Sequence, residues 1–208
     1  MADRGRPRSF DREEALGRGM ELFWLKGFDG ASIAELTGAM GIASPSLYAA
    51  FGSKEGLFRE AVARYLAQEG ADIWQAVLTA GSAHAVIERF LMATATAFTL
   101  EGRPTGCFVV LSAINAGAAS AEVRAELHAW RERNVTGLTQ HLARGVAAGE
   151  IAADTDLEQV ARFYVTVQQG MALQARDGAS RAMLEAIAQS ALAAWGPLTA
   201  GKTVPAGQ

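Results

Sequence analysis

The chain has 208 residues, 50% of them hydrophobic and 20% charged, with a formal net charge of −3 at pH 7. This length and composition support a full hydrophobic core and exceed what one small helical motif needs, so we expect a second functional region. The acidic balance excludes a protein that is basic over its whole surface, as many nucleic-acid binders are.

Cysteine usage and motif content exclude several further classes. Cys107 is the one cysteine, so an internal disulfide and a four-cysteine metal site are ruled out. The charged N-terminus is unlike a signal peptide and no apolar stretch would span a bilayer, so we expect a cytoplasmic protein. We expect no metal and no cofactor, because the histidines lack ligand spacing and no nucleotide-binding or hydrolase motif occurs.

Cys107 itself has two interpretations. The thiol precedes Phe-Val-Val-Leu, which favours a buried small hydrophobic residue over a redox sensor. A nucleophilic pair of Cys107 with His128 stays open as an enzymatic alternative, although nothing marks a third orienting group. Our prediction is that the chain is not an enzyme.

The first residues form a basic arm. Arg4, Arg6 and Arg8 lie in a stretch interrupted by Gly5 and Pro7, so no helix is expected there. One interpretation is a solvated, disordered end. Beside a DNA-binding helix, such an arm instead contacts phosphates or the minor groove. With the arm included, residues 1–65 hold nine basic and nine acidic side chains, so this arm would supply the local positive charge.

Two short helices are predicted next, after a first helix that runs from a capping box at Asp11 to Lys26. Ser32 with Glu35 is a second capping box, and Gly41 ends the helix that follows. Ser44 is the expected N-cap of the next helix, with Pro45 at its first position. This pattern indicates a helix-turn-helix around a small core, for which we predict Phe23, Phe28, Ile33, Leu36, Leu47 and Phe51.

The segment that follows Gly41 carries a family resemblance. It reads Gly-Ile-Ala-Ser-Pro-Ser-Leu-Tyr-Ala-Ala-Phe-Gly-Ser-Lys-Glu-Gly-Leu-Phe. It resembles the recognition-helix segment of the TetR (tetracycline repressor) family of bacterial transcription regulators, with Gly, Leu, Tyr, Phe, Ser and Lys in one register. Two residues depart from the family pattern: Thr37 stands where Ala is usual, and Ala43 where Ser is usual. The Thr37 hydroxyl is expected to bond back to a carbonyl one turn earlier.

The resemblance implies an all-α protein that binds DNA through this motif. Ser44, Pro45 and Ser46 would meet base edges, while Tyr48, Lys54 and Ser32 would hold phosphates. Arg4, Arg6 and Arg8 would add electrostatic affinity. The implied organisation is a DNA-binding domain at residues 1–53, a helical effector-binding and dimerisation domain at 54–198, and a disordered tail at 199–208.

The rest of the chain reads as helices without strand alternation. One long helix from Lys54 toward Gly81 is predicted to connect the two domains. Further helices are expected at His84–Leu100, Gly106–Gly117, Ala121–Gly149, Asp156–Arg176 and Ser180–Trp195.

Two functional surfaces are predicted within this helical part. The resemblance implies a homodimer through the last two helices, with interface candidates Val160, Phe163, Val167, Met171, Leu184, Ile187, Ala191 and Leu192. A mixture of large apolar and isolated polar residues suits a small-molecule pocket, with candidates Phe90, Thr94, Phe98, Cys107, Phe108, Leu111, Asn115, His128, Trp130 and Tyr164.

The function implied by the resemblance is a repressor that binds a palindromic double-stranded DNA operator as a homodimer. A small-molecule effector, whose identity the sequence does not give, would release it. Two alternatives stay open: an activator with the same DNA-binding mode, and a helical dimer that binds small molecules without DNA.

Overall fold

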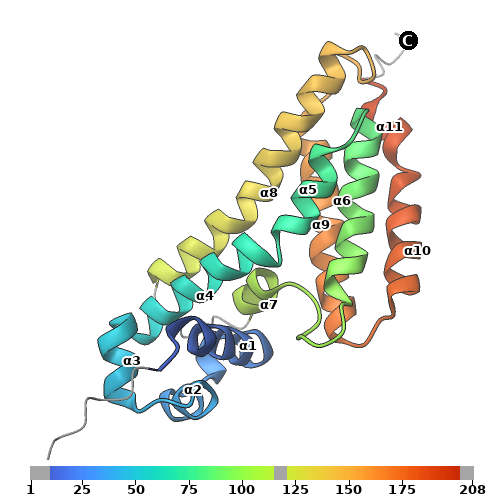
Figure 1. Ribbon diagram of the computed structural model, residues 1–208. Helices are drawn as coiled ribbons and strands as arrows, with labels where there is room; N and C mark the ends of the chain where they lie inside the picture. The colour runs from blue at the N-terminus through green and yellow to red at the C-terminus, as the bar shows by residue number, and fades with distance from the viewer. Residues whose placement is uncertain (1–9, 115–120, 202–208) are drawn as a thin grey trace, which may run out of the picture.

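The computed structural model describes residues 10–114 and 121–201, and all regular secondary structure in these ranges is helical. Figure 1 shows the first three helices of the chain at one end and a bundle of helices at the other, with α4 and α8 running between them. The all-α prediction is confirmed for the described part of the chain.

The N-terminal helices begin where side chains cap them. In α1 (Arg12–Gly30), the Asp11 carboxylate accepts from two backbone N–H groups, and non-helical dihedrals at Gly27 mark a kink where we predicted the helix to stop. In α2 (Ile33–Met40), Ser32 and Glu35 form the predicted capping box. The Thr37 hydroxyl donates to the Ile33 carbonyl at 2.9 Å, also as predicted.

The predicted cap of α3 (Ser44–Phe51) is wrong by one residue. Ala43 is the N-cap and makes no side-chain bond, while Pro45 lies in the first turn. The reason is that Ala43 has extended dihedrals and its carbonyl already accepts from the Leu47 N–H at 3.2 Å. Ser44 is therefore a helical residue, and its hydroxyl does not cap the helix.

The core of the N-terminal helices is larger than predicted. Phe23, Phe28, Leu36, Leu47 and Phe51 are buried, whereas Ile33 is only partly buried. Aromatic rings from two further helices complete this core. Phe58 packs edge-on against Phe23 with ring centroids 5.2 Å apart, and against Phe108 at 5.5 Å. The DNA-binding helices thus rest on α4 (Lys54–Gln68) and α7 (Phe108–Ile114).

The long connecting helix that we predicted is broken in two. After α4 ends, α5 (Ala71–Leu78) begins. The N–H groups of Glu69 and Gly70 both donate to the Tyr65 carbonyl, at 2.8 and 2.9 Å, which interrupts the regular ladder. The Glu69 carboxylate is also ion-paired with Arg103, in the segment between α6 and α7, which ties the break to the bundle.

The other helices fall near their predicted ranges, and α11 was not predicted. Ser82, Asp156 and Ser180 cap the helices that follow them. Thr199, expected in the disordered tail, is buried, and its carbonyl accepts from the Ala152 N–H at 3.2 Å. The bounds are α6 Ala83–Phe98, α8 Ala121–Ala147, α9 Leu157–Arg176, α10 Arg181–Leu192 and α11 Trp195–Thr199.

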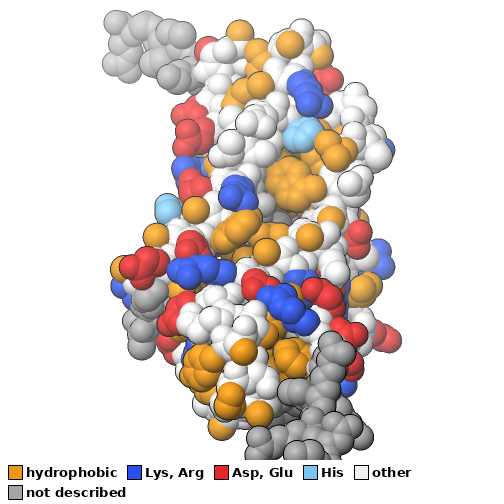
Figure 2. Space-filling view, turned by 60° about the vertical axis from the view of Figure 1, so that its left-hand side comes forward, with side chains coloured by type: hydrophobic (Ala, Val, Ile, Leu, Met, Phe, Trp, Pro, Cys, Tyr) orange, Lys and Arg blue, Asp and Glu red, His pale blue; other side chains and the backbone are white. Residues whose placement is uncertain are grey.

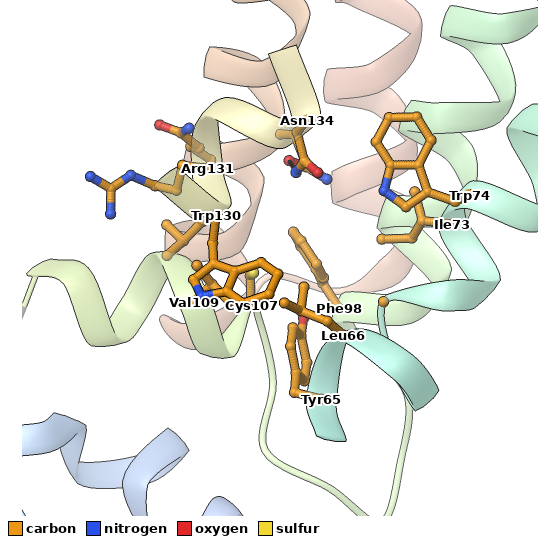
Figure 3. Close-up of a pocket in the computed structure, with 14 residues that line it drawn as sticks. Tyr65, Leu66, Ile73, Trp74, Phe98, Cys107, Val109, Trp130, Arg131 and Asn134 are labelled. Atoms are coloured by element: carbon orange, nitrogen blue, oxygen red, sulfur yellow. Dashed lines mark hydrogen bonds between the residues drawn. The ribbon is translucent and has the colours of Figure 1, made fainter. Parts of the chain in front are cut away.

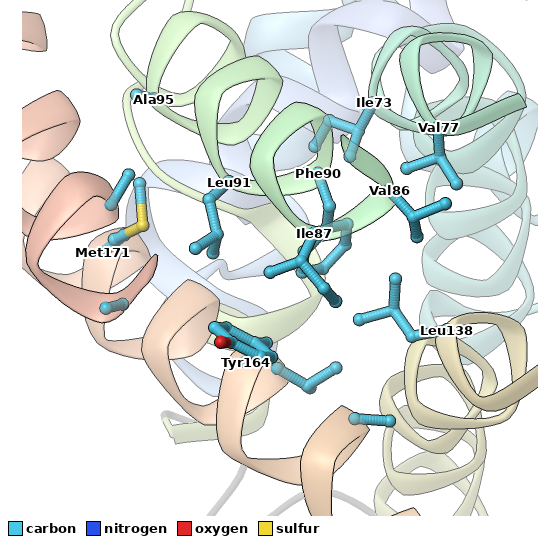
Figure 4. Packing of buried hydrophobic residues seen from close by; sticks show 14 of the residues in the cluster. Ile73, Val77, Val86, Ile87, Phe90, Leu91, Ala95, Leu138, Tyr164 and Met171 are labelled. Carbon is cyan, nitrogen blue, oxygen red and sulfur yellow. The ribbon is translucent and has the colours of Figure 1, made fainter. Parts of the chain in front are cut away.

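A second core fills the bundle. Figure 4 shows Ile73 and Val77 of α5 facing Phe90 and Ile87 of α6, with Leu138 of α8 on the other side. All five side chains are at most 5% exposed. The broken helix α4–α5 therefore contributes to both cores, and it links the DNA-binding end to the bundle.

Candidate DNA-binding surface and effector pocket

The outer face of α3 is exposed while its inner face anchors it. Leu47 and Phe51 are 0% and 6% exposed, whereas Tyr48 is 47% exposed. Ser44 and Pro45 are exposed as well, and Ser46 is half-buried. Gly41, in the left-handed region with φ of 68°, makes the tight turn that sets α3 against α2. The residues predicted to meet DNA bases thus lie on one accessible helix face.

Arg12 holds the far end of α3 in place. Its guanidinium donates to the Ala50 carbonyl at 3.1 Å and pairs with Glu60 of α4 at 2.7 Å. It also lies 4.4 Å from the ring centroid of Phe51. The hydrogen bond to Glu60 raises the pKa of Arg12. One cation therefore joins the start of α1, the end of α3 and the middle of α4.

Most basic side chains of this end have carboxylate partners. Arg18 pairs with Glu14 on α1, and Lys26 pairs with Glu35 across to α2. Arg64 and Arg59 pair with Glu13 and Glu126. This pairing leaves little net positive charge on the described part of the surface.

Two predicted phosphate contacts have partners within the chain. The Lys54 ammonium lies 4.5 Å from the ring centroid of Phe28, and the Ser32 hydroxyl donates to Glu35 at 2.7 Å. Arg4, Arg6 and Arg8 lie outside the described residues. Their part in DNA binding stays a prediction, as do the phosphate contacts.

A small pocket lies where α4, α5, α7, α8 and α9 meet (Figure 3). Its volume is about 60 Å³. Apolar walls come from Leu66, Ile73, Trp74, Phe98, Val109 and Trp130, and polar groups from Tyr65, Cys107, Arg131, Asn134 and Gln168. Asn134 Nδ2 donates to Gln168 Oε1 at 3.1 Å, which joins α8 to α9 beside the pocket. Apolar walls with a few polar groups are typical of small-molecule sites.

Three of the predicted pocket residues line this cavity: Phe98, Cys107 and Trp130. The others are elsewhere. Phe90, Thr94 and Tyr164 are fully buried in the bundle, and Thr94 bonds to its own helix. Phe108 and Leu111 belong to the N-terminal core. His128 is exposed, and Asn115 lies outside the described residues.

Sequence reasoning missed several lining residues. We had placed Tyr65 and Trp74 on the connecting helix and had not singled out Asn134. Helical periodicity shows which face of a helix is apolar, but it does not show which helices meet. The tryptophans could have indicated the pocket from the sequence, because an indole combines a large apolar surface with an N–H donor that needs a partner.

Cys107 and Tyr65 are uncharged groups in the pocket wall. Burial raises the pKa of the Cys107 thiol, and it raises the pKa of the neighbouring Tyr65 hydroxyl well above its usual range. The thiol thus stays protonated at neutral pH, and Cys107 lies half-buried in the pocket wall rather than fully buried as predicted. Because His128 lies on the exposed side of α8, the packing gives no support to a Cys107–His128 pair.

Half of the predicted dimer-interface residues lie on the inner side of their helices. Val160, Met171, Leu184 and Ala191 are at most 8% exposed and pack inside the chain's own core. Phe163 is 38% exposed, and Val167, Ile187 and Leu192 are half-buried. Met183, 56% exposed, joins this outer face. The reason is that each of these helices has apolar residues on two sides. One side packs into the chain's own core, and the other faces outward.

None of the helices in the described ranges combines the length and the hydropathy needed to cross a bilayer. Within those ranges, no three His, Cys, Asp or Glu side chains come together in a way that would hold a metal ion.

Comparison with known proteins agrees with this geometry. Residues 16–61 match the family described as "Bacterial regulatory proteins, tetR family", and residues 84–191 match the "Tetracyclin repressor-like, C-terminal domain". The chain belongs to the TetR family of helix-turn-helix transcription regulators, which are not enzymes.

Several relatives are similar over nearly their whole length. The HTH-type transcriptional repressor ComR of Escherichia coli (strain K12) is 37% identical over 196 residues, 92% of each chain. BdcR, a repressor of the same organism, is 32% identical over 189 residues, 90% of each chain. A cysteine mutant of the TetR family regulator CifR, complexed with 26-bp double-strand operator DNA, superposes with a TM-score of 0.87. It is 47% identical, and the match covers 92% of this chain and 100% of that one.

Proposed function

We propose that the chain is a homodimeric transcriptional repressor that binds a palindromic operator and is released by a small-molecule effector in the bundle. The observation that carries the proposal is the exposed face of α3. Tyr48, Pro45 and Ser46 lie on a helix held by buried Leu47 and by Arg12. The likeness to a regulator complexed with operator DNA supports the same use of this face.

A dimer is part of the proposal because one short helix contacts too few bases for a specific site. Two copies related by a two-fold axis read half-sites about one helical turn apart. The apolar outer face of α9 and α10, with Phe163 and Met183, supports this association.

The proposed release depends on α4 and α5. The pocket touches Tyr65 and Leu66 near the end of α4 and Ile73 and Trp74 on α5. Because α4 packs on the α1 side of the DNA-binding core, a ligand that moves α4 changes the spacing of the two recognition helices. Physically, the ligand prefers the conformation that DNA disfavours, and this shifts the population.

The test is footprinting of the purified protein on the DNA that flanks its own coding sequence. Tyr48→Phe should weaken binding to all duplexes alike, because it removes a phosphate contact, while Ser46→Ala should change the sequence preference. Ser190→Ala on α10 is the matched control, since its hydroxyl bonds within its own helix at 2.9 Å. Operator binding that is unchanged in both α3 variants would refute the assignment.

A further inference from the structure

We infer that the effector is an aromatic carboxylate, whose ring lies between the indoles of Trp74 and Trp130 and whose anionic group is held by Arg133. This inference rests on the proposed function, because it names the ligand class of the same pocket.

Trp130 separates the inner pocket from two cavities on the surface. It lines the inner pocket, a cavity of about 280 Å³ beside Phe58 and Val62, and one of about 320 Å³ beside Trp74 and Gly137. The inner volume of about 60 Å³ holds only a few atoms. Because Trp130 is the side chain common to all three cavities, a ligand that displaced it would reach from the inner pocket into the other two, a size range usual for small-molecule pockets.

The walls of the joined site favour an aromatic ring. Trp74 comes from α5 and Trp130 from α8, so the two indoles approach the space from different helices (Figure 3). Aromatic rings gain from offset or edge contacts with an indole beyond the burial of apolar area. Gly137 lies directly against the Trp74 indole, so the absence of a side chain there lets the indole reach this position in the wall.

The charges along the mouth favour an anion. The Arg133 guanidinium lies 3.8 Å from the ring centroid of Trp130 and is solvent-exposed. In contrast, Arg59 is bonded by its Nε to both oxygens of Glu126, at 2.8 and 2.9 Å. Figure 2 shows hydrophobic atoms gathered along the middle of this face, with basic and acidic side chains around them.

Arg131 adds a second cation. It lines the inner pocket, and its Nη1 is buried without a hydrogen-bond partner among the described residues. His141 lies at the other side of the mouth, and burial together with Arg144 lowers its pKa, so it is largely neutral at pH 7. Arg133 at the mouth and Arg131 in the inner pocket therefore make this site positive in a chain whose net charge is −3.

Besides Arg131, the deep end offers neutral groups that can bond a hydroxyl. The bond from Asn134 to Gln168 leaves the Asn134 oxygen and the Gln168 nitrogen to bond a ligand. Tyr65 and Cys107 are neutral groups beside them. An aromatic ring with a carboxylate at one end and a hydroxyl at the other matches the site. The carboxylate would meet Arg133 at the mouth, and the hydroxyl would meet Asn134 and Gln168 at the deep end.

The experiment compares two probes on the full-length protein, 3-(4-hydroxyphenyl)propionate and its uncharged amide, by calorimetric titration. The carboxylate should bind about tenfold more tightly than the amide, because a charge-assisted bond to guanidinium is lost in the amide. Arg133→Gln should weaken the carboxylate about three- to tenfold and leave the amide unchanged. Arg133→Lys, which keeps the charge, should restore most of the difference.

Arg181→Gln is the matched control, since Arg181 lies on α10 and pairs with Glu185. Equal affinities for the two probes, no binding of either, or an unchanged affinity in Arg133→Gln would overturn the inference. Operator binding by the same preparations keeps the two proposals apart. Intact DNA binding without carboxylate binding would refute only the ligand class, whereas a failure to bind any flanking DNA would count against the repressor.

Discussion

Gly137 on α8 lies against the indole of Trp74 on α5. A β-carbon at position 137 would stand 2.6 Å from Cη2 of that ring, much closer than two carbon atoms approach without strain. The missing side chain lets the two helices approach, and it sets the width of the cavity that both residues line. Glycine is unfavourable inside a helix, and the close contact with Trp74 explains why a glycine stands at position 137.

Gly137→Ala should therefore destabilise the protein, although alanine favours a helix. Overpacking costs about 1–3 kcal/mol, which exceeds the helix-propensity gain of up to about 1 kcal/mol. The measurement is urea unfolding at 25 °C. Gly38→Ala is the control, because a β-carbon there meets no atom within 4 Å, and it should be neutral or stabilising. Equal stability of the two variants would show that Trp74 moves without cost.

Ser32→Ala separates a capping role from a DNA-binding role. Loss of the capping box of α2 should lower the free energy of unfolding by about 1 kcal/mol. Ser180→Ala removes the N-cap bond of α10, far from the DNA-binding end, and should cost a similar amount. Thermal unfolding checks both. If Ser32 also holds a phosphate, only Ser32→Ala weakens operator binding, and equal operator affinities of the two variants would refute that contact.

Acid should weaken the link between α1 and α2. The hydrogen bond from Lys26, with those of the Ser32 side chain and backbone, lowers the pKa of Glu35 to about 2. A lowered folded-state pKa means that the contribution is present above the unfolded pKa of about 4.3 and is lost as the pH falls toward 2.

Glu35→Gln should thus be less stable than the wild type at pH 6, and the difference should shrink between about pH 5 and pH 2. Lys26→Met should show a similar trend, because it removes the first partner of Glu35. Urea unfolding across this pH range measures both. A stability difference between Glu35→Gln and the wild type that does not change with pH would mean that Glu35 forms no ion pair in solution.

Phe163→Asp should convert the proposed dimer into a monomer. Phe163 is 38% exposed on α9, and a carboxylate at the centre of an apolar interface would lose its hydration. Leu78→Asp on α5 is the control, because Leu78 is 60% exposed but lies away from the α9–α10 face. Sedimentation at micromolar concentration distinguishes the two. A Phe163→Asp variant that stays dimeric would place the interface elsewhere.

Local signals accounted for much of the fold. The caps Asp11, Ser32 and Ser180 act on backbone groups within three residues of themselves, so the sequence is sufficient to predict them. The stretch from Gly41 to Lys54 likewise indicated both the turn and the exposed helix, because a left-handed glycine and an apolar stripe are local features.

Contacts between distant segments were beyond such signals. The break after Gln68 depends partly on the ion pair of Glu69 with Arg103, which lies on another segment. The pocket likewise depends on where Tyr65, Trp74 and Asn134 meet, and these residues come from α4, α5 and α8.

The sequence by itself determined most of the helices, most of their caps and the DNA-binding motif, since these depend on neighbours along the chain. Only the tertiary structure decided which apolar stripes turn inward. Val160 and Leu184 are buried while Phe163 and Met183 are exposed, although all four are apolar. The physical reason is that helical periodicity defines a face, whereas the packing of other helices decides whether that face is covered.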